Sequence, residues 1–158
     1  MKEGDSLPQL ELHDAAGAPF RLAVAKGARG LAVYFYPKDD TAGCTREAQA
    51  FGALLPDFAA IGVEVIGVSK DPPERHRRFI DKHALAVRLA SDDGSACEAF
   101  GVWGDKQLYG RTYQGIERAT FLFDAAGVLV RQWRRVRVAG HAEAVLAAAR
   151  ALPAHDDR

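Results

Sequence analysis

The stretch Leu31-Ala32-Val33-Tyr34-Phe35-Tyr36 runs directly into Pro37-Lys38-Asp39-Asp40-Thr41-Ala42-Gly43-Cys44. A short apolar run without polar alternation is typical of a strand that is buried on both faces. Beyond it, apolar residues recur at helical spacing, which predicts a helix from about Cys44 to a stop at Gly62, with Pro56 as a point of kinking. The sequence therefore predicts that Cys44 lies in the first turn of a helix that follows a buried strand.

Strand and helix patterns alternate along the rest of the chain. Residues 10–13 and 20–22 flank a turn at 14–17 and predict an N-terminal hairpin, and the same tetrapeptide at 124–127 predicts a second one. Asp71-Pro72-Pro73-Glu74 predicts a helix start with Asp71 as the N-cap. We expect further strands at 63–68 and 87–90, further helices at 94–100 and 141–152, and a long ordered loop at 101–115. This order predicts an α/β fold in one domain, residues 1–158, with a mixed sheet flanked by helices on both faces.

Composition and charge limit the classes of partner. Lys+Arg and Asp+Glu both total 21, so the net charge is zero and no overall field favours nucleic acid or an anionic membrane. No apolar run approaches the roughly 20 residues that cross a bilayer. The charged start Met1-Lys2-Glu3-Gly4-Asp5 lacks the apolar core of a secretory signal, so we expect a cytoplasmic protein. The basic stretch 131–137 is interpreted as a charged edge strand rather than a nucleic-acid site.

Cys44 is the candidate nucleophile. Only a thiolate is a good nucleophile, and the unpaired N–H groups and macrodipole at a helix N-terminus favour negative charge there. Thr41 can point its hydroxyl into the same pocket, and Pro37 would shield the sulfur from water. On these residues alone, a buried structural cysteine is as good an interpretation as a reactive one.

A family resemblance separates these two interpretations. Pro37, Thr41 and Cys44 have the Pro-x-x-x-Thr-x-x-Cys spacing of the peroxiredoxin active-site motif. The surrounding Phe-Tyr-Pro-Lys-Asp-x-Thr-x-Gly-Cys-Thr-x-Glu resembles the peroxiredoxin Q subfamily, also called bacterioferritin comigratory protein. Later segments at 101–104, 115–122 and 133–141 resemble that subfamily as well. The resemblance implies a thioredoxin-like fold and a peroxidase that needs no metal, haem or flavin.

The resemblance also implies a role for each motif residue. Cys44 would attack the terminal oxygen of a hydroperoxide and become a sulfenic acid, and Thr41 would bind and orient the peroxide. Arg118, which matches the arginine of the family that precedes Thr120, would stabilise the thiolate and the charge on the departing oxygen. Its other interpretation is a surface ion pair.

One feature departs from the subfamily pattern. Many members carry a second, resolving cysteine five residues after the first, and here that position is Gln49. Another placement of that cysteine falls at 74–84, where this chain has none. Cys97 is interpreted as a buried core residue, with a resolving role after local unfolding as the alternative. The favoured hypothesis is a one-cysteine cycle in which thioredoxin, glutaredoxin or glutathione reduces Cys44. The resemblance favours a monomer, with a small homodimer as the alternative.

Three rival interpretations remain open to test. A cysteine hydrolase needs a base beside the thiol, and no histidine lies in a recognisable partner motif. A binding module that kept the fold and lost activity is disfavoured by the intact motif. A metal site at His76 and His83 lacks a third ligand. Asp39 and Asp40 are expected to be solvated or capping groups rather than catalytic acids.

Overall fold

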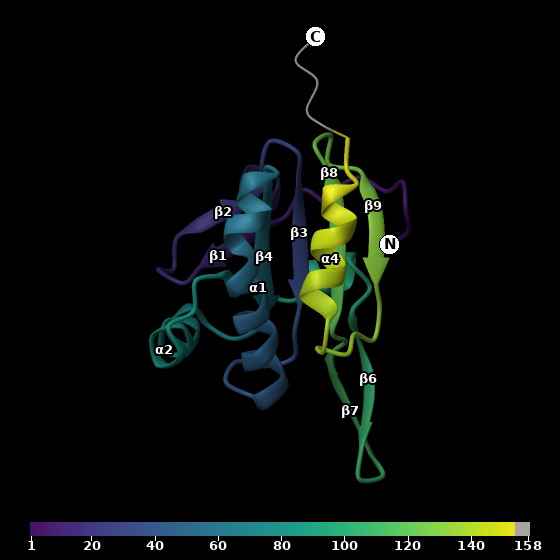
Figure 1. The fold of residues 1–158 in the computed structure, drawn as a ribbon. Coiled ribbons are helices and arrows are strands. Elements are labelled where there is room, and N and C mark those ends of the chain that lie inside the picture. Colours follow the sequence, from purple (N-terminus) through teal and green to yellow (C-terminus); the bar gives the residue numbers. More distant parts are fainter. Residues whose placement is uncertain (154–158) are drawn as a thin grey trace.

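The structure is a computed structural model that describes residues 1–153. Seven strands form one mixed sheet in the order β2-β1-β5-β4-β3-β8-β9 (Figure 1). Their bounds are β1 Glu11–Asp14, β2 Pro19–Arg21, β3 Gly30–Phe35, β4 Val63–Ser69, β5 Arg88–Ser91, β8 Ala119–Asp124 and β9 Leu129–Trp133. The helices are α1 Ala42–Ala60, α2 Pro73–His83, α3 Ser95–Ala99 and α4 His141–Arg150, with a short 3-10 turn η1 at Leu22–Ala25. The predicted α/β fold with an N-terminal hairpin is confirmed.

The central strand β3 feeds two hydrophobic cores. All six of its residues are buried, and it pairs in parallel with β4 and antiparallel with β8. Because side chains alternate across a strand, Val33 and Phe35 join the core that contains η1 and α3. Ala32 and Tyr34 join the core on the opposite face, which contains residues of α1, α2 and α4. Helices therefore cover both faces of the sheet, as the sequence predicted.

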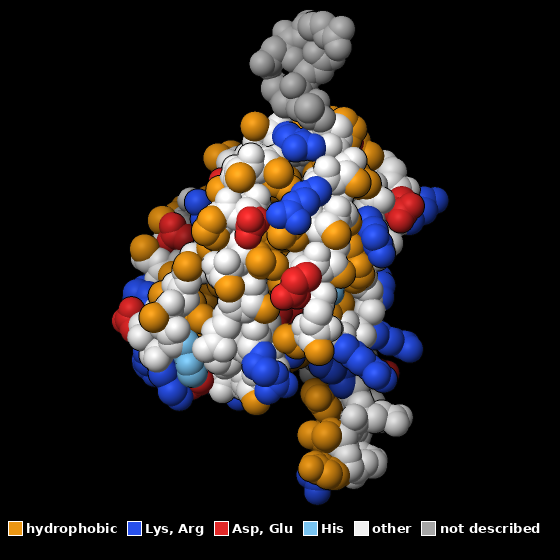
Figure 2. Space-filling view, in the orientation of Figure 1, with side chains coloured by type: hydrophobic (Ala, Val, Ile, Leu, Met, Phe, Trp, Pro, Cys, Tyr) orange, Lys and Arg blue, Asp and Glu red, His pale blue; other side chains and the backbone are white. Residues whose placement is uncertain are grey.

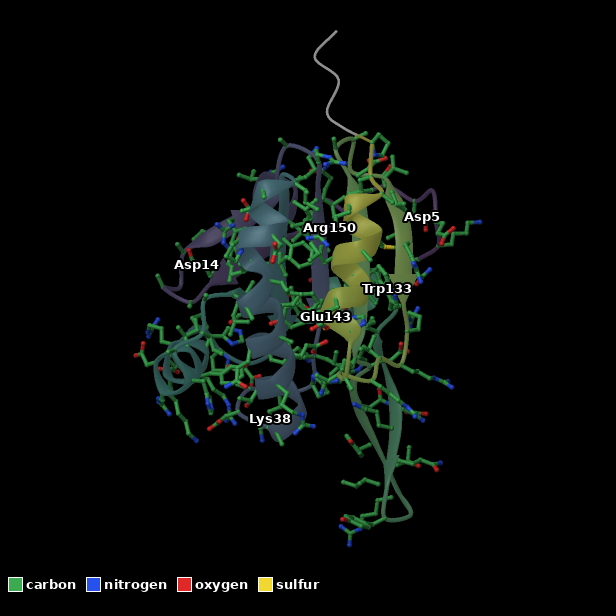
Figure 3. The ribbon with its side chains drawn as sticks, viewed as in Figure 1. Asp5, Asp14, Lys38, Trp133, Glu143 and Arg150 are labelled. Carbon is green, nitrogen blue, oxygen red and sulfur yellow. The ribbon has the colours of Figure 1, made fainter. Side chains whose placement is uncertain are left out.

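The junction after β3 places Cys44 as predicted. The strand ends at Phe35, and α1 begins at Ala42 with Thr41 as its N-cap. Cys44 is thus the third residue of the helix, and the helix continues through Pro56 to Ala60. Lys38 lies in the connecting loop at the N-terminal end of α1 (Figure 3).

The prediction of a long loop at 101–115 is wrong. These residues form a two-stranded antiparallel hairpin of β6, Trp103–Leu108, and β7, Arg111–Ile116. Tyr109 and Gly110 both have positive φ, as the tight two-residue turn of a hairpin requires. The hairpin projects from the body of the molecule and carries exposed apolar side chains, among them Leu108 and Tyr109 (Figures 1 and 2). The glycines and aromatic residues of this segment suggested a loop, but in the structure they belong to the two paired strands and the turn between them.

Two smaller predictions are also corrected. Pro72, not Asp71, is the N-cap of α2, and the Asp71 carboxylate accepts hydrogen bonds from Ser69 Oγ and the Asp39 backbone N–H. The basic stretch 131–137 is only partly a strand, since β9 ends at Trp133. Its first part does lie at the edge of the sheet, as predicted. No helix within residues 1–153 is long and apolar enough to span a membrane.

Candidate active site

The sulfur of Cys44 meets a guanidinium at the start of α1. Arg118 lies directly before β8, which pairs with β3, and this pairing brings it to the N-terminal end of the helix. Arg118 Nη2 donates to Cys44 Sγ at 3.3 Å, and Cys44 is only 1% exposed. A helix N-terminus and a fixed cation both stabilise a thiolate. The structure therefore brings together two of the four predicted site residues in direct contact.

Glu47 completes this contact and has no role in the sequence prediction. Arg118 Nη1 donates to Glu47 Oε1 at 2.6 Å, and the carboxyl group is buried. Burial raises the pKa of Glu47 to about 7, against the opposing effect of the Arg118 charge. Glu47 lies three residues after Cys44, so the two side chains share one face of the helix. This spacing is the one feature of the sequence that could have indicated Glu47 as a site residue.

The same network keeps the guanidinium charged. Burial disfavours the Arg118 cation, but the nearby Glu47 and Cys44 outweigh it and raise the pKa of Arg118. Gly43 lets the guanidinium approach, because a Cβ at this position would lie 3.1 Å from Arg118 Nη2. The arginine is therefore held on one side by a carboxylate and lies against bare backbone on the other.

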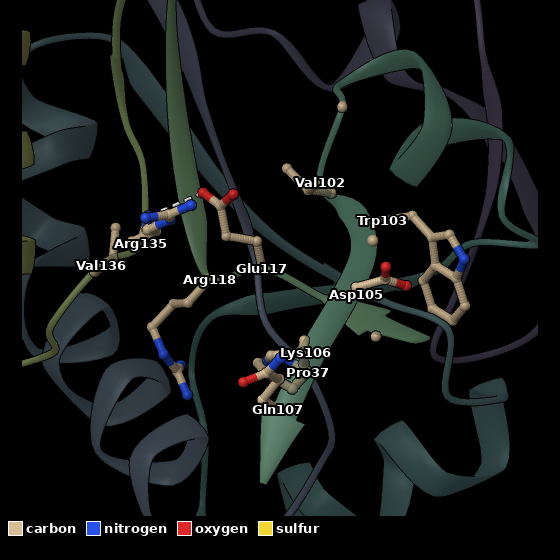
Figure 4. A pocket seen from close by; sticks show the side chains of 13 residues that line it. Pro37, Val102, Trp103, Asp105, Lys106, Gln107, Glu117, Arg118, Arg135 and Val136 are labelled. Atoms are coloured by element: carbon tan, nitrogen blue, oxygen red, sulfur yellow. Dashed lines mark hydrogen bonds between the residues drawn. The ribbon is translucent and has the colours of Figure 1, made fainter. Parts of the chain in front are cut away.

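Pro37 and Thr41 line cavities beside the loop that leads into α1. Pro37 lines two adjoining cavities of about 560 and 510 Å³. Arg118 lines the first cavity, where its side chain extends towards α1 (Figure 4). Thr41 lines the second, and its hydroxyl donates to the Lys38 carbonyl at 3.1 Å. With its proton used in this way, the Thr41 oxygen keeps lone pairs that can accept a hydrogen bond from a ligand.

The two aspartates of the loop differ, and only Asp40 is solvated as predicted. Asp39 is buried, and its carboxylate accepts from Tyr36 Oη at 2.5 Å and contacts His76 Nδ1 at 2.6 Å. Its expected solvation is wrong, because two buried partners, Tyr36 directly after β3 and His76 of α2, replace water. Asp40 is exposed and pairs with Lys82 Nζ at 2.7 Å and His83 Nε2 at 2.8 Å.

Cys97 is buried, as predicted, and lies on the other face of the sheet. It belongs to the core with α3 and η1, whereas Cys44 belongs to the core with α1 and α4. Burial raises the pKa of the Cys97 thiol far above its ordinary value, and the Asp92 carboxylate raises it further. A thiol in this state is a poor nucleophile.

His141 lies in a contact between α4 and β8. His141 Nε2 contacts Thr120 Oγ1 at 2.7 Å, and burial together with the Arg118 charge lowers the pKa of His141 to about 4. Within residues 1–153, no group of three or more His, Cys, Asp or Glu side chains is placed to hold a metal ion.

Comparison with known proteins identifies the family. Residues 4–132 match the AhpC/TSA family. The chain is 50% identical over 122 residues to peroxiredoxin Bcp of Xanthomonas campestris, covering 77% of this chain and 76% of the relative. It is 43% identical over 139 residues to peroxiredoxin Bcp of Bacillus subtilis, covering 87% and 88%.

Solved structures agree with this assignment. The bacterioferritin comigratory protein of X. campestris, studied for its alkyl peroxide reduction activity, superimposes with a TM-score of 0.86 at 42% identity, covering 95% of this chain and 98% of that one. A PrxQ variant of Xylella fastidiosa gives a TM-score of 0.89 at 38% identity, covering 96% of each chain. The chain therefore belongs to the AhpC/TSA family, as a peroxiredoxin of the Bcp, or PrxQ, type.

Proposed function

We propose that this chain reduces hydroperoxides with the Cys44 thiolate. The sulfur attacks the terminal oxygen of ROOH, a sulfur–oxygen bond forms and the oxygen–oxygen bond breaks. Cys44 becomes a sulfenic acid, and the departing RO⁻ takes up a proton to leave as ROH. The contact of Arg118 Nη2 with Cys44 Sγ at 3.3 Å is the observation that supports this reaction most directly. A cation in this position stabilises both the thiolate and the charge that develops on the peroxide.

Three further residues are assigned supporting roles in this proposal. Thr41 accepts a hydrogen bond from the peroxide. The Thr41 hydroxyl proton is already donated to the Lys38 carbonyl, so the hydroxyl oxygen is free to act as an acceptor. Pro37 narrows the entrance between the two cavities. Glu47 anchors the second nitrogen of Arg118, so that the guanidinium is fixed before the substrate arrives.

The cycle proposed for this chain uses one cysteine. The chain has two cysteines, and Cys97 lies in a different core from Cys44. A Cys44–Cys97 disulfide needs Cα atoms within roughly 7 Å, so it would require local unfolding. We therefore propose that an external thiol, from thioredoxin, glutaredoxin or glutathione, reduces the sulfenic acid. The alternatives are a two-cysteine cycle through Cys97 and a binding module without turnover.

The wider setting is proposed on chemical grounds. The thiolate supplies both electrons that split the peroxide bond, so the reaction requires no metal or organic cofactor. We propose that the chain acts as a single domain, as a monomer or small homodimer, without a nucleic-acid or membrane partner. A cytoplasmic location fits its need for a thiol reductant and its free cysteines.

Mass spectrometry after one equivalent of hydroperoxide tests the reaction and the cycle separately. With a sulfenic-acid trap present, we expect an adduct on Cys44 in the native chain and in Cys97→Ser, and none in Cys44→Ser. Absence of peroxide consumption by the native chain would refute the peroxidase proposal. A Cys44–Cys97 disulfide without the trap would refute only the one-cysteine cycle.

A further inference from the structure

Two consecutive aspartates of the loop between β3 and α1 contact two histidines of α2. Asp39 contacts His76, and Asp40 contacts His83, seven positions further along the helix. The Asp39 backbone N–H also donates to Asp71 Oδ2 at 2.9 Å, just before α2 begins. The loop that carries Pro37 and Thr41 is therefore attached to α2 at two consecutive residues, Asp39 and Asp40.

The inner of these attachments is closed to water. Asp39 is 1% exposed and His76 is 0% exposed, and the distance between Asp39 Oδ2 and His76 Nδ1 is 2.6 Å. Tyr36 Oη donates to the other oxygen of the same carboxylate at 2.5 Å. A buried carboxylate needs such partners, and removal of one of them leaves charge without compensation.

The outer attachment lies at a strained piece of backbone. Asp40 has a φ of +62°, in the left-handed region that non-glycine residues rarely adopt. It directly precedes Thr41, whose carbonyl accepts from the Thr45 N–H in the first turn of α1. A conformation of this kind persists only where its surroundings hold it. The buried contacts of the neighbouring Asp39 do so here, whereas the pairs of Asp40 with Lys82 and His83 are exposed and contribute less.

We propose that His76 is a positioning residue for peroxide reduction. It fixes the Asp39 carboxylate, and through it the loop conformation that sets Pro37 and Thr41 at the entrance to the Cys44 site. This inference rests on the proposed peroxidase function. It assigns His76 no contact with the substrate, and it leaves stabilisation of the thiolate to Arg118 and the start of α1. Loss of the contact therefore affects orientation of the peroxide and spares the reactivity of the sulfur.

Two rates measured on the same variants test this separation. The first is the rate of Cys44 oxidation by hydrogen peroxide, and the second is the rate of Cys44 alkylation by iodoacetamide, which needs the thiolate but not an oriented peroxide. In His76→Leu we expect oxidation to fall about tenfold or more, because small displacements of positioning groups are costly, while alkylation stays within about twofold. His76→Asn, which keeps a donor near the place of Nδ1, is expected to recover most of the oxidation rate.

His83→Gln is the matched control. It changes a histidine of the same helix that contacts the same loop, but this pair is exposed and Lys82 still holds Asp40. Because exposed pairs contribute little, both rates are expected to remain near those of the native chain.

The outcomes that overturn the proposal differ from failure of the peroxidase function. An unchanged oxidation rate in His76→Leu, an equal loss of alkylation, or no recovery in a folded His76→Asn would each refute the positioning role. If His76→Leu does not fold, Asp39→Ala removes the same contact from the loop side and is judged by the same two rates. Failure of the proposed function would instead show as a native Cys44 that peroxide does not oxidise.

Discussion

Arg118 Nη2 lies 3.3 Å from Cys44 Sγ, although the two residues are 74 positions apart in the chain. The other terminal nitrogen of the same guanidinium donates to Glu47 at 2.6 Å. Because two different groups hold its two ends, the guanidinium has a fixed orientation before any substrate binds. Fixed donors and charges of this kind cost no reorganisation during a reaction.

Replacement of Arg118 by lysine tests this bridging. Lysine keeps the positive charge, but a single ammonium cannot present the planar fork that reaches Glu47 and Cys44 together. We expect Arg118→Lys to slow Cys44 oxidation by about 100-fold or more, as for loss of one transition-state donor. Rapid-mixing kinetics with hydrogen peroxide measure this, and Arg137→Lys, at an exposed position, is the control. Equal rates in the two variants would contradict the assigned role.

Gly43→Ala tests the close approach of the guanidinium to the helix. The new Cβ would lie 3.1 Å from Arg118 Nη2 and push it out of place, so we expect oxidation to slow about tenfold. Gly52→Ala is the control on the same helix, since a Cβ there meets no atom closer than 3.8 Å. Alanine has a higher helix propensity than glycine, so neither change is expected to slow oxidation by unfolding the helix, and thermal unfolding of both variants checks this. If both variants oxidise equally fast, the close approach does not matter.

Glu47 is expected to make stability fall as the pH rises. Burial raises the pKa of Glu47 from 4.5 to about 7 in the folded chain. Between these two pH values the folded state keeps a proton on Glu47 that the unfolded state releases. The contribution of Glu47 to the free energy of unfolding is therefore complete below pH 4.5 and is lost as the pH rises through about 7. The loss is about 3 kcal/mol in the free energy of unfolding. In urea unfolding, the difference in the free energy of unfolding between the native chain and Glu47→Gln is expected to shift by this amount, to the disadvantage of the native chain, as the pH rises across this range. A difference that does not change with pH would contradict it.

His141 is expected to give the opposite slope. Burial lowers the pKa of His141 from 6.5 to about 4, and the Arg118 charge acts in the same direction. Between these two pH values the unfolded state binds a proton that the folded state does not bind. The contribution of His141 to the free energy of unfolding is therefore complete above pH 6.5 and is lost as the pH falls through about 4. His141→Gln can keep a hydrogen bond to Thr120 without titrating. In the same urea experiment, the free energy of unfolding should therefore fall more steeply with rising pH in His141→Gln than in the native chain. An equal pH dependence in the two proteins would contradict this.

The sequence alone determined the junction that carries the nucleophile. A fully apolar run can only be a buried element, and the helical spacing after it places Cys44 in a first turn, because these periodicities are properties of neighbouring residues. The motif spacing and the family resemblance then pointed to Arg118, which no local pattern distinguishes from a surface arginine.

Only the tertiary structure decided what surrounds that junction. The sequence suggested a solvated Asp39, but Tyr36 and His76 enclose its carboxylate in the fold. The role of Glu47 depends on Arg118, which lies directly before β8 and far away in the sequence. The hairpin at 103–116 was missed because its glycines and aromatics suit a loop as well as a ribbon. Burial and charge pairing depend on which distant segments meet, and a linear pattern records neighbours along the chain rather than neighbours in space.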